Sequence, residues 1–322
     1  MHMIARLSAV ALALSVLSTG AHAASLRPYF PGRLYVTVQA SNAIEIFPEQ
    51  TLWRGLRAAH YDDISPNGRL LLVTSAMPGQ VYILNAHTGK HLAKIALGKA
   101  TQGVKITPDS RTALVVEPGA GAVAVIDLKR MKLIKTIPVG AVPHNVRFTH
   151  NGDKAYVTLQ KTGGVAVINM RTLTRTGEIP LPGLQGPHNL DLADHDRRLW
   201  VRDLNDHAAV VDLRTGKVLK YIQVGKGHGG LDVIPGGRYV FVGAIADKVV
   251  DAIDTRTLKV VREIPVGIGP HGVRASRDGK WVYAEVTGTS RLAVINTRTL
   301  KVVRQIPIKG KFPFWGAVRG NE

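Results

Sequence analysis

The sequence predicts an all-β protein, namely a seven-bladed β-propeller of four-stranded antiparallel blades, whose ring is closed by the C-terminal strand pairing with N-terminal strands. Three observations predict this fold: a repeat of about 42 residues, strand-like periodicity inside each repeat, and an incomplete repeat at each end of the chain. A repeat of that length is typical of one propeller blade. Helical periodicity is not sustained in any segment.

The repeat is visible when six segments are aligned. They start 42, 42, 44, 41 and 42 residues apart, at His60, Gln102, His144, His188, Gly229 and His271. Since every segment carries the same order of apolar and turn residues, each is one structural unit of an array.

Each unit contains the signals of four strands. In the third unit, an alternating run (HNVRF) is followed by an Asn-Gly turn, the run KAYVTL, a Gly-containing turn and the run GVAVIN. A further polar turn leads to a fourth run, which in a later unit reads KVVREIPVG. Short alternating runs separated by Gly, Asn and Asp are the pattern of antiparallel strands.

The two ends of the chain complement each other. Residues 33–47 (RLYVTVQASNAIEIF) resemble the second and third strands of a unit, and residues 312–320 (FPFWGAVRG) resemble a first strand. Joined, they form the seventh blade. A closed ring leaves no unpaired sheet edge, which is why we expect this closure.

The first residues have the pattern of a secretory signal peptide. Arg6 supplies a positive charge, residues 7–17 form an apolar core, and Ala21-His22-Ala23 fit a cleavage site. We therefore expect residues 1–23 to be removed, residues 24–322 to form the propeller, and the protein to be periplasmic or secreted. The apolar core is too short for a transmembrane helix, and no transmembrane segment is expected elsewhere.

The composition excludes several kinds of site. The chain has no cysteine, which rules out disulfides, covalent c-type haem and thiolate-bound metals. The 45% of hydrophobic residues therefore has to stabilise the fold through packed sheets. The net charge of +19 favours anionic partners without choosing among them.

The repeat resembles the YVTN-type β-propeller repeat family, which includes YncE-like periplasmic proteins. The resemblance rests on the third unit's Pro143-His144-Asn145, Tyr156-Val157-Thr158 and residues 165–169, and on later copies such as Ile264-Pro265-Val266-Gly267. It implies the fold and says little about activity. A more distant resemblance extends to haem d1-binding propellers and to copper-cluster propellers whose inner strands supply histidines.

One set of equivalent residues is expected to meet at the axis, because the first strand of every blade lines the central channel. The set comprises His60, Gln102, His144, His188, Gly229, His271 and Phe314, with His228 displaced by one residue. Three or four imidazoles suit a transition metal. We predict a metal site of His60, His144, His188, His228 and His271, with copper as the first candidate and zinc or haem iron as alternatives. A structural role, in which the histidines bond to neighbouring blades, remains open.

A second ring of charged residues follows three positions further along the same strands: Asp63, Lys105, Arg147, Asp191, Asp232 and Arg274, with Ala317 completing it. Two interpretations remain open. The charges pair with one another as a polar channel lining, or they bind a cofactor. In the second case Arg147, Lys105 and Arg274 hold its carboxylate or phosphate, while Asp191 or Asp232 orients the histidines. An odd spacing places the two rings on opposite strand faces unless the strand bends.

Three acids, Glu117, Asp203 and Glu285, lie near the ends of second strands, at or beside the Thr position of the Tyr-Val-Thr run. They supply acids to the channel rim or are ordinary loop charges.

Basic residues recur in the outer hairpin of the blades and predict a belt around the disc. They are Lys129, Arg130, Lys132, Lys135, Arg171, Arg175, Arg214, Lys217, Lys220, Arg256, Lys259, Arg262, Arg298, Lys301 and Arg304. Such a belt binds nucleic acid or anionic lipid in a salt-dependent manner, or it protects edge strands from aggregation.

Three functions are therefore open. The first is a periplasmic binding propeller that holds a metal, or a metal cofactor such as haem, or another small ligand at the histidine mouth. The second is a polyanion-binding scaffold. The third is a lactonase-like metal-dependent hydrolase, for which Asn145 and Asn189 are the only indications. No catalytic residue is assigned.

Overall fold

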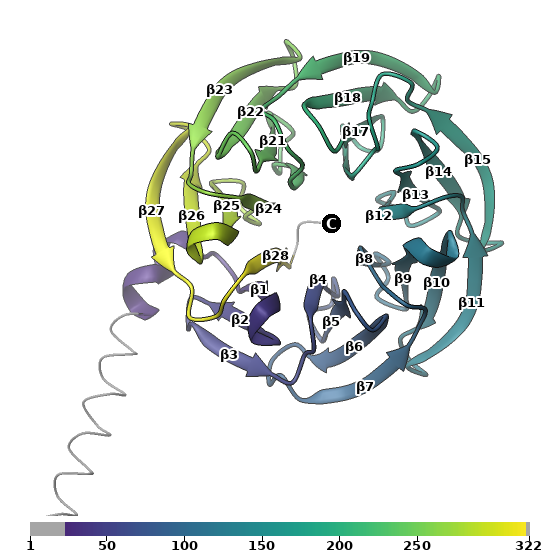
Figure 1. Ribbon diagram of the computed structural model, residues 1–322, viewed down its shortest axis with the longest axis horizontal. Coiled ribbons are helices and arrows are strands. Elements are labelled where there is room, and N and C mark those ends of the chain that lie inside the picture. Colours follow the sequence, from purple (N-terminus) through teal and green to yellow (C-terminus); the bar gives the residue numbers. More distant parts are fainter. Residues whose placement is uncertain (1–22, 320–322) are drawn as a thin grey trace, which may run out of the picture.

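The computed structural model describes residues 23–319, and its 28 strands form seven four-stranded antiparallel sheets around one axis (Figure 1). The predicted fold class is confirmed. The proposed signal peptide, residues 1–23, lies outside the described residues except for its last position.

The innermost strand of each blade lies against the axis. In chain order these strands are β4 (Ala59–Ile64), β8 (Val104–Ile106), β12 (Pro143–Phe148), β16 (Asn189–Ala193), β20 (Leu231–Val233), β24 (Pro270–Ala275) and β28 (Pro313–Val318). The second strands are β1 (Leu34–Val38), β5 (Leu70–Ser75), β9 (Thr112–Glu117), β13 (Lys154–Leu159), β17 (Arg198–Arg202), β21 (Tyr239–Ala244) and β25 (Trp281–Val286).

The third strands are β2 (Ala43–Phe47), β6 (Gln80–Asn85), β10 (Ala122–Asp127), β14 (Gly164–Asn169), β18 (His207–Asp212), β22 (Val249–Asp254) and β26 (Arg291–Asn296). The outer strands are β3 (Thr51–Arg54), β7 (His91–Ala96), β11 (Lys132–Pro138), β15 (Thr174–Pro180), β19 (Lys217–Gln223), β23 (Lys259–Pro265) and β27 (Lys301–Pro307). Short 3-10 turns occur at η1 (Arg27–Tyr29), η2 (Gln39–Ser41), η3 (Pro118–Ala120) and η4 (Thr287–Thr289).

The ring closes where the two ends of the chain meet. β28 pairs with β1 in the sheet order β28-β1-β2-β3, with Leu34 opposite Val318 and Tyr35 opposite Ala317. The predicted seventh blade is thus correct in its strand composition, and the yellow end of the chain lies beside the purple one (Figure 1).

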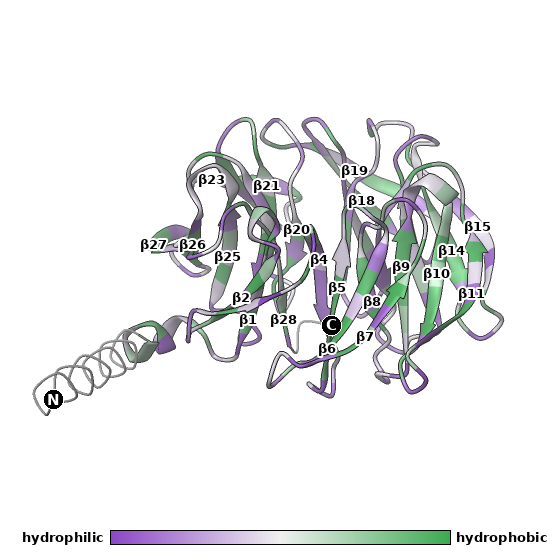
Figure 2. Cartoon of the chain, turned by 60° about the horizontal axis from the view of Figure 1, so that its bottom comes forward, coloured by the Kyte–Doolittle hydropathy of each residue, from purple (hydrophilic) through white to green (hydrophobic). Residues whose placement is uncertain are grey.

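The core lies between neighbouring blades. Val146 and Phe148 of β12 pack with Val123 and Val125 of β10, which belongs to the preceding blade. The hydrophobic segments follow the strands (Figure 2), whereas an outer strand such as β11 buries only Ile137 among its seven residues. Stacked sheets with exposed outer strands stabilise the fold without disulfides.

A β-bulge near the start of the innermost strands allows the histidine set and the charged set to lie on the same strand face, despite their odd spacing. In β4, Ala59 lies opposite Ser75 but Asp62 lies opposite Val73, so the strand contains one extra residue; β12, β24 and β28 are bulged at the same place. An extra residue in a strand moves the side chains of all following residues to the opposite face of the sheet. His60 and Asp63 therefore both turn toward the axis.

The Thr of the Tyr-Val-Thr run holds this bulge in place. Thr158 Oγ1 accepts the backbone N–H of Asn145 at 3.0 Å and donates to the carbonyl of His188 in the next blade at 2.8 Å. Thr74 accepts the N–H of Tyr61 in the same way, at 3.0 Å. The motif thus fixes both the bulge and the adjacent blade.

The disc has two faces of different composition. Antiparallel strands alternate in direction, so every innermost strand begins at the same face of the disc. The loops between second and third strands, and the loops from each outer strand to the next blade, lie at this face too. We call it the histidine face. The hairpin turns after the innermost strands and after the third strands form the other, the turn face. None of the helices in residues 23–319 has the length and apolarity needed to cross a membrane.

Candidate functional site at the histidine face

Aromatic and imidazole rings from different blades stack at the start of the innermost strands. The ring of Phe314 lies 4.0 Å from the imidazole of His60 and 3.8 Å from that of His271, centroid to centroid. His60 Nε2 in turn bonds Gln102 Oε1 at 2.9 Å. The closing strand therefore supplies the phenyl ring that joins the histidines of two other blades.

The remaining histidines continue this arrangement around the axis. His144 and His188 stack at 3.7 Å, and His228 contacts His188 at 4.9 Å and His271 at 5.1 Å, edge to face. All five predicted histidines thus lie together with Gln102 and Phe314, and we call this set the axial ring. The displaced His228 reaches it from the glycine-rich loop before β20.

The imidazoles of the axial ring are neutral. Burial lowers the pKa of His60 to about 4 and that of His144 to about 3. The pKa values of His188 and His271 are also well below the usual range, first because of burial and then because of the neighbouring imidazoles. Neutral rings stack without charge repulsion, and each keeps a nitrogen lone pair.

Several of these nitrogens form hydrogen bonds to neighbouring residues; His144 Nδ1, for example, lies 3.1 Å from the carbonyl oxygen of His188. Gln39 and Gln102 bond the two ring nitrogens of His60, at 2.9 Å each, and Gln160 bonds His188 Nδ1 at 2.8 Å. Within residues 23–319, no group of three or more His, Cys, Asp or Glu has a geometry that would hold a metal ion. Ligation of one ion by several of these histidines stays a prediction.

Tyr61 and Trp315 lie just beyond the axial ring. The sequence did not predict that they would reach this place. The ring of Tyr61 is 5.7 Å from that of His144 and 4.4 Å from that of Trp315, and both side chains are about 1% exposed. They are the second residues of their bulges, where Gly or Asn stands in β24 and β12. The predicted polar channel therefore carries an apolar layer at this level.

The charged ring consists of ion pairs between neighbouring blades. The paired atoms are Lys105 Nζ and Asp63 Oδ1 at 2.9 Å, Arg147 Nε and Asp191 Oδ1 at 3.3 Å, and Arg274 Nη1 and Asp232 Oδ1 at 3.0 Å. Each carboxylate also accepts a backbone N–H of the next blade, from Ile106, Val233 and Ala275 respectively. The salt-bridged lining is confirmed; cofactor binding by Arg147, Lys105, Arg274, Asp191 and Asp232 stays a prediction.

Breaking one of these pairs is expected to destabilise the protein strongly. Asp232→Ala leaves the buried Arg274 guanidinium without its carboxylate, which costs about 3–5 kcal/mol. In urea unfolding, Asp153→Ala, which removes an exposed pair with Arg171, should cost less than about 1 kcal/mol. Equal losses in the two variants would contradict the energetic role of the charged ring.

The rim acids hold the loops of the histidine face. Glu117 Oε1 accepts the N–H of Gly98 at 2.8 Å, and Asp203 Oδ2 accepts that of Gln185 at 3.1 Å. Glu285 differs, since neither of its buried carboxyl oxygens has a hydrogen-bond partner within the described chain. Two of the three predicted rim acids thus fix the loops around the mouth.

Arg202, another residue that sequence analysis missed, supports the loop of His228. Its fully buried guanidinium donates to the carbonyls of Gly243 at 3.1 Å and Gly225 at 3.0 Å, and also to that of Gly227. The signal was an Arg at the Thr position of the Tyr-Val-Thr run. The pKa of His228 is lowered first by the burial of its imidazole and then by the charge of Arg202.

Cationic and apolar side chains surround the axial ring on the histidine face. Exposed lysines stand in its loops at Lys99, Lys161, Lys226, Lys248 and Lys311. Exposed apolar side chains stand there at Met77, Val142, Leu204, Ile268 and Phe312. Phe312 lies 6.4 Å from Phe314, which connects this surface to the axial ring.

The two asparagines considered for a hydrolase site have structural partners. Asn145 Nδ2 donates to Asn189 Oδ1 at 2.5 Å, and Asn189 Nδ2 donates to the carbonyl of Gly229 at 2.7 Å. Both side chains are buried. Their amides join consecutive blades.

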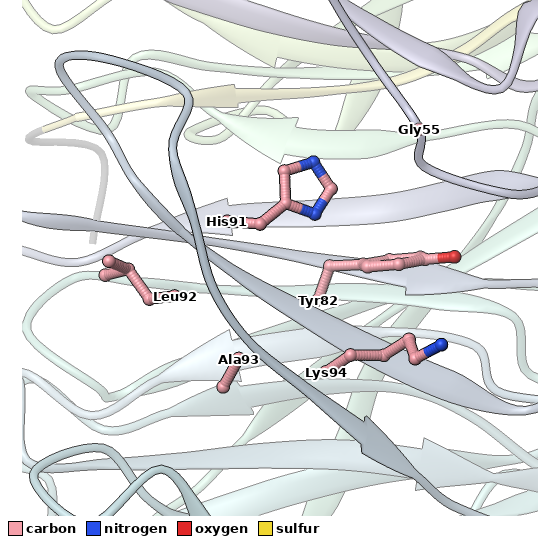
Figure 3. A pocket seen from close by; sticks show the side chains of 6 residues that line it. All are labelled: Gly55, Tyr82, His91, Leu92, Ala93 and Lys94. Atoms are coloured by element: carbon pink, nitrogen blue, oxygen red, sulfur yellow. The ribbon is translucent and has the colours of Figure 1, made fainter.

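A separate shallow hollow lies along the outer strand β7, in the blade formed by β4 to β7. It is lined by Gly55, Tyr82, His91, Leu92, Ala93 and Lys94 (Figure 3). His91 Nε2 is 3.3 Å from the carbonyl of Arg54, and the exposed side chains do not converge on one point. This hollow adds no chemistry to the axial site.

These features define the class of the protein: a seven-bladed propeller whose one mouth is closed by a ring of imidazole and aromatic side chains. Residues 199–312, about a third of the chain, match the family model of the cytochrome D1 heme domain. No protein of curated function matches the sequence.

Solved structures with the same fold are similar over most of the chain. Kuenenia stuttgartiensis hydrazine synthase is 19% identical, with a TM-score of 0.74 over 82% of this chain and 90% of that one. A functionally unknown protein from Desulfotomaculum acetoxidans is 15% identical, with a TM-score of 0.78 over 90% and 100%. Dihydro-heme d1 dehydrogenase NirN in complex with DHE is 18% identical, with a TM-score of 0.68 over 90% and 75%. The distant likeness to haem d1-type propellers is confirmed; the resemblance to YncE-like proteins stays a prediction.

Proposed function

We propose that the protein binds an iron tetrapyrrole of the haem type across the axial ring, with an imidazole as axial ligand. The observation that carries the proposal is the continuous arc of neutral imidazole and phenyl rings at the mouth, from His144 through His228 to Phe314 and His60. A second support is the match of residues 199–312, which contain His228 and His271, to a heme domain.

The residues of the histidine face fit such a group. A haem is flat and apolar over its macrocycle and carries carboxylates at its edge. The axial ring with exposed Phe312 supplies apolar and aromatic contact, and the loop lysines supply positive charge for carboxylates. Neutral imidazole is the usual axial ligand of haem iron, which when bound supplies redox or ligand-exchange chemistry.

His228 is the best candidate for the axial ligand. Its imidazole is half-buried, and neither of its ring nitrogens forms a hydrogen bond to any described residue. By contrast, His60 uses both nitrogens, and Nε2 of His188 and Nδ1 of His271 are buried. Burial, and then the charge of Arg202, lower the pKa of His228 below its ordinary value, which favours the neutral imidazole with a free lone pair near pH 7.

Haem accounts for this geometry better than a directly bound copper or zinc ion. Copper and zinc in proteins require three or four ligands that converge on one point. The stacked rings of His144 and His188 turn their faces, not their nitrogens, toward each other. A haem needs only one protein nitrogen, because the macrocycle supplies the other four.

The expected location is an extracytoplasmic compartment, in agreement with the proposed signal peptide. N-terminal sequencing of protein from its native host should begin at Ala24. Protein whose N-terminal sequence still begins at Met1 would contradict export with cleavage of the signal peptide.

Haem binding is tested by absorption titration of purified protein. We expect a Soret band that saturates at one haem per chain, and His228→Ala should weaken binding at least about tenfold and shift the band, since the axial bond is lost. His150→Ala is the matched control, because His150 is exposed on the turn face, and it should leave both unchanged. Wild-type protein without a Soret change, or a His228→Ala variant that binds like the wild type, would contradict the assignment. Stoichiometric copper in haem-free protein would favour the copper alternative.

A further inference from the structure

The turn face repeats one cationic motif in three consecutive blades. The sequence Arg-Thr-x-Lys spans the turn between the third and outer strands in each, with the basic residues Arg214 and Lys217, Arg256 and Lys259, and Arg298 and Lys301. Copies lie about one blade repeat apart. They therefore occupy equivalent places along an arc of the disc edge.

All six side chains are exposed and free of ion pairs. None of them forms an ion pair within 4 Å with a carboxylate of residues 23–319. The residue that begins each turn instead accepts backbone N–H groups: Asp212 accepts those of Arg214 and Thr215, and Asp254 those of Arg256 and Thr257. In the third turn Asn296 takes this place. The turns thus present cations, while their Asp and Asn side chains stabilise the turn.

The turns of this face expose no large apolar side chain. The exposed apolar side chains of the described chain lie either in loops of the histidine face, such as Ile268 and Phe312, or along outer strands, such as Val261. The partner of the turns is therefore recognised by charge. A protein partner would require an apolar centre, and single-stranded nucleic acid would require exposed aromatic side chains for stacking.

We propose that the turn face is a docking surface for an anionic lipid membrane. Charges along an arc at one side of a disc contact a plane simultaneously, and lipid phosphates form such a plane. The belt predicted from the sequence is thus concentrated toward one face. The bound protein holds the axial ring away from the membrane, so the site of the proposed function stays accessible; the inference itself does not depend on haem binding.

Co-sedimentation with vesicles tests the proposal. The chain without residues 1–23 should bind phosphatidylcholine vesicles that contain about 30% phosphatidylglycerol, and not pure phosphatidylcholine, with binding that weakens steeply as salt rises. The variant Arg214→Gln, Lys217→Gln, Arg256→Gln, Lys259→Gln should lose at least about tenfold in partitioning.

The control removes the same charge from the other face, through Lys99→Gln, Lys161→Gln, Lys226→Gln and Lys248→Gln, and should change partitioning less than about twofold. Equal losses in both variants would show non-specific attraction and overturn the assignment of the face. Binding to duplex DNA without binding to the anionic vesicles would overturn the lipid assignment. Since no haem is involved, either result leaves the test of the axial site untouched.

Discussion

A chain that ends after Lys311 is expected to lose cooperative folding. The truncation removes β28, which is the innermost strand of the closing blade, together with the buried side chains of Phe314 and Trp315. Each large aromatic side chain lost from a core costs about 3–5 kcal/mol. The truncation also exposes the edge of β1 and removes the carbonyl of Gly316, which accepts from Arg274 Nε at 2.7 Å.

Together these losses approach the whole stability of a domain, about 5–15 kcal/mol. Calorimetry should therefore show no sharp transition for the truncated chain. Trp315→Ala serves as a milder variant, for which we expect a lowered melting temperature and a retained transition. An unchanged melting temperature in both would refute closure of the ring by β28.

Glu285→Gln is expected to stabilise the protein at neutral and alkaline pH. Burial raises the pKa of Glu285 to about 8, from a usual value of 4.5. Its carboxyl is packed beside the backbone of Gly272 and Gly316, and a Cβ at Gly316 would lie 2.5 Å from Oε1. Neither carboxyl oxygen has a hydrogen-bond partner in the described chain, so only the neutral form fits this place well.

The direction of the pH dependence follows from the raised pKa. The folded protein binds the proton more tightly than the unfolded chain, so the stability contributed by Glu285 is complete below pH 4.5 and is lost as the pH rises toward 8. The loss is roughly 5 kcal/mol at most. The Gln variant has a neutral side chain of the same shape at every pH and therefore avoids this loss of stability.

Melting curves of the wild type and the variant at pH 5, 7 and 9 measure this difference. Asp251, whose pKa burial also raises, affects both proteins alike. The pKa of Asp62 is raised by burial and also by the charge of Glu285, so the measured difference includes the relief of Asp62 from that charge. Glu178→Gln, an exposed change on β15, should give no growing difference. The prediction would be wrong if the difference in melting temperature between the wild type and Glu285→Gln were the same at pH 9 as at pH 5.

Local patterns in the sequence were sufficient for the fold. The 42-residue repeat, the alternating runs and the complementary ends predict seven blades and the closing strand, because strand period and turn chemistry are local properties. The same repeat identifies which residues reach the axis, including Phe314 at the position where other blades carry His or Gln.

Side-chain direction within the axial site depended on the tertiary structure. The sequence left open whether His60 and Asp63 share a strand face, and the bulge at Tyr61 decides it. Likewise, the repeat brings His144 and His188 together but does not say whether their rings stack or converge on a metal.

The sequence by itself therefore determined the propeller, its closure and the membership of the axial and charged rings. Only the tertiary structure decided that the charged residues pair across blades, that Tyr61 and Trp315 pack beside the axial ring, and that neither ring nitrogen of His228 bonds to a described residue. The physical reason is that strand pairing follows from a period along one chain segment. Ring orientation and ion pairing instead depend on contacts between blades about 42 residues apart, which compete for the same atoms at the axis.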